Sequence, residues 1–259
     1  MSEDYQKSHW LNRLWRWAAT GFFFGIFGIG GLVLSLIWFS LLRLIIRQPE
    51  KLNQMTLGSI RFCFRCFIGA LRTAGILDYR FVGAEKFEQD TGCLVVANHP
   101  TLLDYVFLAS CMPRCDCIVK QALLKNVFCR GVIRAAGYLV NAGSEQLMVA
   151  CEERLKTGGT LLVFPEGTRS IPGKSLSLQR GAANIAVRAR CDVRVVRISC
   201  TPPMLTKRGK WYNIPPIKPQ FIITVENKIS ADKFIDEHDL SPALAARRLT
   251  HYLRSELTR

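Results

Sequence analysis

The stretch CLVVANHPTLLD, residues 93–104, joins an unbroken apolar run to a polar turn. Five apolar residues in succession predict a strand over Cys93–Ala97 that is buried on both faces, as in layered α/β proteins. His99 follows this strand, and Asp104 comes five residues later among leucines and Tyr105. Because an unpaired imidazole or carboxylate is costly in apolar surroundings, we expect His99 and Asp104 to pair.

The predicted place of His99 is typical of a catalytic residue, because open α/β sheets hold their sites at the carboxyl ends of strands. Asp104 would fall in the first helical turn beyond. A carboxylate that binds one imidazole nitrogen fixes the tautomer and leaves the other nitrogen free to take a proton from a hydroxyl. A buried pair with a purely structural role is the alternative that this motif alone leaves open.

A second motif, LLVFPEGTRS over residues 161–170, is another apolar strand that ends in a polar turn. It brings Glu166, Gly167, Thr168 and Arg169 to what should be the same edge of the sheet. Glycine lets backbone amides come close to a ligand, and arginine offers a fork of donors suited to phosphate. Alone, this motif would predict only a turn with a surface arginine; together, the two motifs predict one site.

The rest of the chain after Asp78 alternates β-rich runs with helical segments. Strands are predicted over 79–82, 93–97, 117–120, 160–164, 193–198 and 221–225, and helices over 146–156 and 178–190. A last helix begins with Ser241 as its N-cap and Pro242 at its first position. The predicted fold class is therefore α/β, a layered domain over residues 78–259 with a largely parallel or mixed sheet flanked by helices.

Residues 1–77 are predicted to form a membrane-embedded helical segment. No charged residue occurs from 17 to 42, which exceeds the roughly 20 residues that span a bilayer. Tryptophans and the arginines Arg13 and Arg16 precede this run, and Arg43 and Arg47 follow it, as expected at headgroup depth. One span is the first interpretation. The glycines between 25 and 31 leave a broken helix that enters one leaflet and returns as the alternative, since each weakens a helix by about 1 kcal/mol.

The stretch over residues 57–77 carries three arginines among apolar residues. A basic amphipathic stretch of this kind is typical of a helix in the membrane interface. An ordinary core helix of the domain is the equal alternative.

The net charge of +15 indicates an acidic partner. Nucleic acid is not expected, because the basic residues are dispersed and form no recognisable module. With the apolar segment, the charge indicates membrane lipids or a phosphorylated substrate.

The ten cysteines are irregularly spaced, and several lie in apolar runs, as free thiols in a reducing cytosol do. A metal site would have to come from Cys63 and Cys66, or from Cys111, Cys115 and Cys117. Neither set has the paired spacing of a zinc module, so no metal is assigned. The catalytic domain is expected at the membrane on its cytoplasmic side, which in a bacterium is the inner membrane.

NHPTLLD at 98–104 and FPEGTRS at 164–170, about sixty residues apart behind a hydrophobic N-terminus, resemble two signature blocks of the lysophospholipid acyltransferase family. That family includes 1-acyl-glycerol-3-phosphate acyltransferases, and the resemblance covers roughly residues 80–205. It implies that His99 is the general base and Asp104 its orienting partner. It implies acceptor-binding roles for Glu166, Gly167, Thr168 and Arg169, and more weakly for Lys120 and Arg180.

The resemblance also implies the reaction. An acyl group would pass from acyl-CoA or acyl-carrier protein, as the donor substrate, to a hydroxyl of a lyso-lipid acceptor, with no cofactor. Backbone amides would stabilise the oxyanion.

The sequence departs from the family pattern at several places. The family's second block commonly ends in an acidic residue and an arginine, whereas GYLVNAGS at 137–144 has Asn141 and Ala142. Thr101 replaces a common serine and keeps its hydroxyl. The missing arginine leaves the acceptor open between lysophosphatidic acid, with Arg180 or Lys120 supplying the charge, and another lyso-lipid or a glycolipid.

Two other functions are alternatives to acyl transfer. An α/β-hydrolase needs a nucleophile elbow, and no G-x-S-x-G sequence occurs in the chain. A basic membrane scaffold without catalysis would have no need of His99 and Asp104. The sequence therefore favours an acyltransferase.

Overall fold

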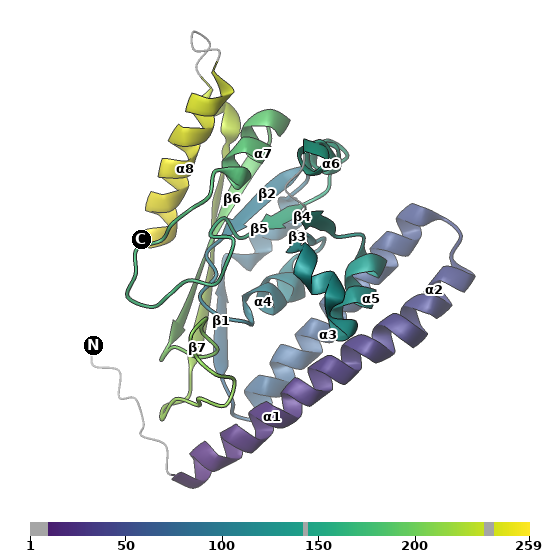
Figure 1. The fold of residues 1–259 in the computed structure, drawn as a ribbon, viewed down its shortest axis with the longest axis vertical. Helices are drawn as coiled ribbons and strands as arrows, with labels where there is room; N and C mark the ends of the chain where they lie inside the picture. The colour runs from purple at the N-terminus through teal and green to yellow at the C-terminus, as the bar shows by residue number, and fades with distance from the viewer. Residues whose placement is uncertain (1–9, 142–144, 236–240) are drawn as a thin grey trace.

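The structure is a computed structural model that describes residues 10–141, 145–235 and 241–259 (Figure 1). The departure at Ala142 lies outside these residues. The strands are β1 Asp78–Val82, β2 Cys93–Ala97, β3 Asp116–Lys120, β4 Leu139–Asn141, β5 Leu161–Val163, β6 Asp192–Thr201 and β7 Gln220–Ser230. The helices are α1 Trp10–Val33, α2 Phe39–Ile45, α3 Pro49–Thr73, α4 Asp104–Cys111, α5 Val127–Ala136, α6 Glu145–Lys156, α7 Gly181–Ala189 and α8 Pro242–Thr258.

Short helical turns complete the described elements. A π-helical turn over Leu34–Trp38 joins α1 to α2, and 3-10 turns occupy Ala84–Gln89, Gln121–Lys125 and Ala231–Phe234.

The described strands form one seven-stranded sheet in the order β1-β7-β6-β2-β5-β3-β4. β6, β2, β5, β3 and β4 are parallel to one another, whereas β7 is antiparallel to β6 and parallel to β1. This confirms the predicted layered α/β fold with a mixed sheet. Parallel strands end at one edge of the sheet, so the loops that follow β2, β3, β5 and β6 meet there.

Both faces of the sheet are covered, which explains the unbroken apolar run in β2. All five residues of β2 are fully buried. Val95 and Ala97 pack in a core with residues of α3 and α4, whereas Leu94 and Val96 pack in a second core with residues of α6, α7 and α8. Figure 1 shows α7 and α8 on one side of the sheet and α3 and α4 on the other.

The N-terminal helices form an antiparallel pair. The chain runs from Trp10 to Ile45 through α1, the π-turn and α2, and then returns as α3. Two indole N–H groups join the two arms of the pair, Trp15 to the Ala74 carbonyl just after α3 at 2.9 Å and Trp38 to the Ser59 hydroxyl within α3 at 2.8 Å. A helix broken at the glycines is not observed, because α1 is continuous through residues 25–31 and the chain reverses at residues 46–48.

The helix α3 packs in the core of the domain. Ile68 and Leu71 are buried with residues of α4, as the core-helix interpretation expects, whereas Phe62 on the outer face is 67% exposed. β1 begins at Asp78, and the domain boundary placed there stays a prediction.

Arg16 is placed differently from its predicted position at the membrane surface. Its side chain is fully buried, and its guanidinium donates to the carbonyls of Pro215, Pro216 and Ile217 at 3.0–3.3 Å. The charge of Arg16 and its place before the apolar run predicted a contact with lipid headgroups. The carbonyls that bind Arg16 instead lie about 200 residues further along the chain, so no neighbouring residue in the sequence indicated this contact.

A buried ion pair fastens β6 to the turn before β2. Arg194 contacts both carboxylate oxygens of Asp90 at 2.5 Å and donates to the carbonyls of Glu226 and Lys86. The two side chains are 3% and 1% exposed. Water therefore cannot solvate either charge if the other is removed.

Replacing Arg194 with methionine is expected to lower the free energy of unfolding by about 3–5 kcal/mol, because Asp90 would stay buried without its partner. Urea unfolding followed by circular dichroism measures this change. The double variant Arg194→Met/Asp90→Leu should regain most of the loss. Near-native stability of Arg194→Met would contradict the role given to the pair.

Candidate active site

His99 and Asp104 pair as expected. His99 lies in the loop after β2 and Asp104 at the first position of α4, and His99 Nδ1 is 2.8 Å from Asp104 Oδ2. The carboxylate is fully buried, whereas the imidazole is 20% exposed. Because Nδ1 is held by a carboxylate, it carries the proton and Nε2 is left as the acceptor.

The surroundings of Asp104 fix its orientation. The backbone N–H of Thr101 donates to Asp104 Oδ2 at 2.7 Å, and the Thr101 hydroxyl donates to Oδ1. Burial raises the pKa of the Asp104 carboxyl, and the hydrogen bonds from His99 and Thr101 oppose that rise. The hydroxyl that Thr101 keeps in place of serine is thus used to hold the carboxylate.

The second motif is locked to the first through Glu166. Its carboxylate oxygen Oε1 accepts from the backbone N–H of His99 at 2.9 Å and from the Ser170 hydroxyl at 2.7 Å. The backbone N–H of Ser170 donates to the His99 carbonyl at 2.7 Å. Glu166 therefore positions the loop that carries His99, while its acceptor-binding role stays a prediction.

Arg169 lies at the same edge and lines the cavity beside His99. Its Nη1 donates to the carbonyls of Leu205 and Thr206, both at 3.0 Å, in the loop after β6. Leu205 has a left-handed backbone with φ of 52°, and its carbonyl also accepts from the N–H of Leu102 at 3.1 Å. Within the described residues only Nη1 is engaged, so the other guanidinium donors are available to a ligand.

The remaining predicted acceptor residues divide into two groups. Gly167, with φ of 65°, Thr168 and Lys120 line the cavity, and Lys120 makes no ion pair with a described residue. Arg180 is exposed just before α7 and is not among the lining residues. The structure thus brings Lys120 to the site, whereas it does not bring Arg180 there.

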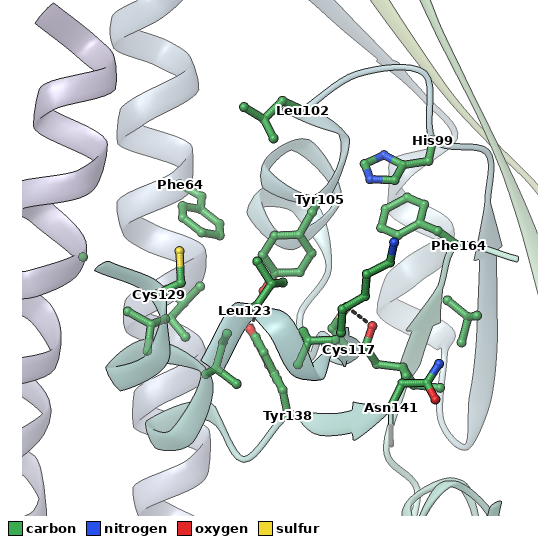
Figure 2. Close-up of a pocket in the computed structure, with 18 of the residues that line it drawn as sticks. Phe64, His99, Leu102, Tyr105, Cys117, Leu123, Cys129, Tyr138, Asn141 and Phe164 are labelled. Atoms are coloured by element: carbon green, nitrogen blue, oxygen red, sulfur yellow. Dashed lines mark hydrogen bonds between the residues drawn. The ribbon is translucent and has the colours of Figure 1, made fainter. Parts of the chain in front are cut away.

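A large apolar cavity of about 1300 Å³ opens beside His99. It is enclosed by α1 and α3 on one side and by β3, α5 and the loop after β5 on the other. Its lining includes Phe27, Phe64, Tyr105, Val132 and Met148. Figure 2 shows His99 and Phe164 face to face at one end of the cavity, with Tyr138 and Asn141 toward the other. Such a space suits a long hydrocarbon chain whose reacting group lies at His99.

Two residues of this site went unrecognised in the sequence. Phe164 stacks on His99 with ring centroids 4.3 Å apart, and Asn98 exchanges hydrogen bonds with the backbone of Ile198 on β6 at 2.7 and 2.8 Å. Both flank the motif residues directly. The sequence features that could have identified them are the aromatic residue directly after β5 and the asparagine directly before His99.

Cysteine side chains also line the cavity that holds His99. All ten cysteines lie in the described part of the chain and are free. Cys117 lines the cavity, and burial raises its pKa to about 12, so it is a neutral thiol near pH 7. Cys117 therefore supplies no thiolate nucleophile to the cavity beside His99.

The fold and this site define an α/β protein with a histidine–aspartate pair at the open end of an apolar cavity. Residues 78–201 match the model of the family described as Acyltransferase. This match covers just under half of the chain, which over these residues is similar to the acyltransferase family and to the 1-acyl-sn-glycerol-3-phosphate acyltransferases.

Named relatives show the same similarity. The 1-acyl-sn-glycerol-3-phosphate acyltransferase of Helicobacter pylori is 31% identical over 137 residues, which cover 50% of this chain and 55% of that protein. The alpha enzyme of that name from Bos taurus is 28% identical over 190 residues, covering 58% and 63%. The matched part of the chain spans about half to two thirds of these relatives.

A solved structure shares the fold over nearly the whole chain. The crystal structure of the 1-acyl-sn-glycerophosphate acyltransferase from Thermotoga maritima matches with a TM-score of 0.69 and 22% identity, covering 95% of this chain and 97% of that one. The similarity therefore includes the N-terminal helices as well as the catalytic domain.

Proposed function

We propose that this protein is a membrane-bound O-acyltransferase that moves a fatty acyl group from an acyl thioester to the hydroxyl of a lysophospholipid, 1-acyl-glycerol-3-phosphate. The observation that carries the proposal is the His99–Asp104 pair, with Nε2 free, at the mouth of an apolar cavity that also holds Arg169 and Lys120. The names of the relatives support the same acceptor.

The reaction is a direct transfer. His99 Nε2 takes the proton of the acceptor hydroxyl as its oxygen attacks the thioester carbonyl carbon. The carbon–sulfur bond then breaks, and the leaving thiolate takes the proton back from His99. Asp104 stabilises the imidazolium between these steps. The donor is acyl-CoA or acyl-carrier protein, whose thioester is already activated, so the step needs no cofactor.

The two cations support a phosphorylated acceptor. Arg169 keeps guanidinium donors available, and Lys120 stands at the end of β3 without an ion-pair partner among the described residues. Both line the cavity that begins at His99. Lys120 thus supplies the second positive charge that the family pattern places in the segment at residues 137–144.

The N-terminal helices support attachment to a membrane. The helix Trp10–Ile45 is long and apolar enough to cross one, with a mean hydropathy of 2.2 in its most apolar window. Six of its exposed apolar residues, at 42–69% exposure, follow one helical stripe: Phe22, Ile26, Ile29, Val33, Leu36 and Ile37.

We place this helix along one leaflet rather than across the bilayer. The domain contacts α1 at Gly21 through Trp211 and at Gly31 through the carbonyl of Phe128. A helix held along its length could not cross the bilayer unless the domain entered the membrane with it. The exposed stripe would then lie among the acyl chains, where a membrane-bound acceptor reaches the cavity. The free thiols support a cytoplasmic location for the domain.

Replacing Arg169 with alanine is expected to raise the KM for lysophosphatidic acid roughly ten- to hundredfold, because a charge-assisted hydrogen bond contributes about 1.5–3 kcal/mol. The KM for a lyso-lipid without an anionic phosphate group should change much less. Kinetics on both acceptors, followed by mass spectrometry of the products, measure the difference.

Arg180→Ala is the matched control, because Arg180 is exposed and does not line the cavity. Its KM for lysophosphatidic acid should stay near that of the wild type. Equal losses on both acceptors in Arg169→Ala would show that Arg169 only holds Leu205 and Thr206, and would remove it from phosphate recognition.

A further inference from the structure

The loop after β6 presents a cluster of cations and aromatic rings next to the start of α1. We call Lys207, Arg208, Lys210, Trp211 and Tyr212 the basic-aromatic patch. All five residues are exposed, with Trp211 at 43% and Tyr212 at 41%. None of the three cations forms an ion pair with a described residue; Lys210 Nζ instead lies 5.4 Å from the centre of the Tyr212 ring.

The patch is fixed against α1. The Trp211 indole stacks on that of Trp17, with centroids 6.5 Å apart and an interplanar angle of 22°, and it also contacts Phe24. Gly21 makes room for the indole, because a Cβ there would lie 3.2 Å from the ring. Figure 1 shows the loop between β6 and β7 beside the N-terminal end of α1.

Exposed tryptophans of α1 extend the same surface. Trp10, Trp15 and Trp17 are 72%, 56% and 47% exposed. Large rings left exposed together beside unpaired cations are typical of a surface at headgroup depth, where one side of the ring is apolar and the other is wet.

Both ends of this loop are held by buried or site residues. At one end, the carbonyls of Leu205 and Thr206 accept from Arg169. At the other end, the fully buried Arg16 of α1 donates to the carbonyls at residues 215–217. The loop therefore ties the position of α1 to the position of Arg169 in the active site.

We propose that the basic-aromatic patch docks on anionic phospholipid headgroups and so sets the height of the active site above the membrane. The cations match a negative surface, and the rings continue the surface of α1 that we have placed in one leaflet. This proposal rests on the proposed membrane attachment. Docking would hold Arg169 where the headgroup of a membrane-bound acceptor can reach it without leaving the bilayer.

Lysine labelling tests the contact without requiring turnover. The full-length protein is bound to vesicles of phosphatidylcholine, with or without phosphatidylglycerol, and treated with a water-soluble amine reagent before mass spectrometry. Lys207 and Lys210 should be protected several-fold more by the anionic vesicles, whereas the exposed Lys233 should react equally with both. Protection no greater with anionic than with neutral vesicles would overturn the proposal.

A charge-reversal variant tests the consequence for activity. Lys207→Glu/Arg208→Glu/Lys210→Glu should lower transfer in anionic vesicles about tenfold or more, since each basic residue adds to attraction by a negative surface, and should leave transfer in neutral vesicles near that of the wild type. The control Lys233→Glu/Arg247→Glu/Arg254→Glu makes the same change in charge at exposed positions. Equal losses in the two variants, or in the two vesicle types, would overturn the proposal.

The two readouts separate this inference from the proposed function. If Lys207 and Lys210 are protected but the protein transfers no acyl group, the proposed activity is contradicted and the docking surface is supported. If acyl groups are transferred but anionic vesicles do not protect the two lysines, the proposed activity is supported and the docking surface is contradicted. No binding to either vesicle would overturn both the docking surface and the membrane attachment on which it rests.

Discussion

Replacing His99 with alanine is expected to lower acyl transfer by about 100- to 10,000-fold, the usual contribution of a general base. The imidazole is held by Asp104 at 2.8 Å and is 20% exposed beside the cavity, so its Nε2 is the available acceptor for a substrate proton. Turnover of the purified protein, measured from the acylated product by mass spectrometry, gives the change in kcat.

His251→Ala is the matched control, because His251 is exposed on α8. Its kcat should equal that of the wild type. Circular dichroism should show that His99→Ala remains folded, since the imidazole is not part of the buried core. Near-normal turnover by folded His99→Ala would remove His99 from the mechanism.

The Asp104→Asn variant is expected to lose about 100-fold or more of its kcat, because general-base catalysis depends on the tautomer of the histidine. The carboxylate accepts three hydrogen bonds, one from His99 and two from Thr101. An asparagine has one acceptor oxygen and an NH₂ group, so it cannot accept all three in the same geometry. The Nδ1–H tautomer would lose its partner or the Thr101 turn would shift.

Two measurements test the Asp104→Asn variant: the dependence of its kcat on pH, and its thermal midpoint, which reports whether it is folded. If Asp104 orients His99, kcat should fall while the KM for both substrates changes little. Raising the pH should not restore the kcat of Asp104→Asn, because the variant lacks a hydrogen-bond acceptor for His99 Nδ1–H and deprotonation of another group does not replace it. A variant that is folded and keeps wild-type kcat would contradict the positioning role.

Much of the sheet could be predicted because burial on both faces leaves a direct mark in the sequence. β2 was predicted at its observed bounds, and β6 and β7 were predicted within longer strands. The pairing of His99 with Asp104 also followed from local sequence, since both groups are costly in an apolar stretch and lie five residues apart.

β4 and α5 were missed for physical reasons. β4 has three residues, too few to show a period, and α5 carries Arg130 and Arg134 in a ten-residue segment whose apolar side packs against the N-terminal helices. Both are stabilised by tertiary contacts more than by local preference.

Hydrogen bonds that backbone carbonyls accept could not be predicted from the sequence either. Every residue carries a carbonyl, so nothing in the letters marks Leu205 as the partner of Leu102 and Arg169, or residues 215–217 as partners of Arg16. The glycines in α1 left a broken helix open as the alternative to one span, and local sequence could not decide between the two. Those between residues 25 and 31 do not break the helix; Gly31 allows the close approach of the Phe128 carbonyl, whereas Gly25 and Gly30 have no atom within 4 Å of the place where a Cβ would lie.

The most direct test of the central claim is a single assay of the purified protein in phospholipid vesicles. Lysophosphatidic acid and an isotope-labelled acyl-CoA or acyl-carrier protein are supplied, and the lipids are identified by mass spectrometry. We expect phosphatidic acid carrying the labelled acyl chain to be formed by the wild type and not by His99→Ala. Release of free labelled fatty acid, with no labelled phosphatidic acid from either donor, would contradict it.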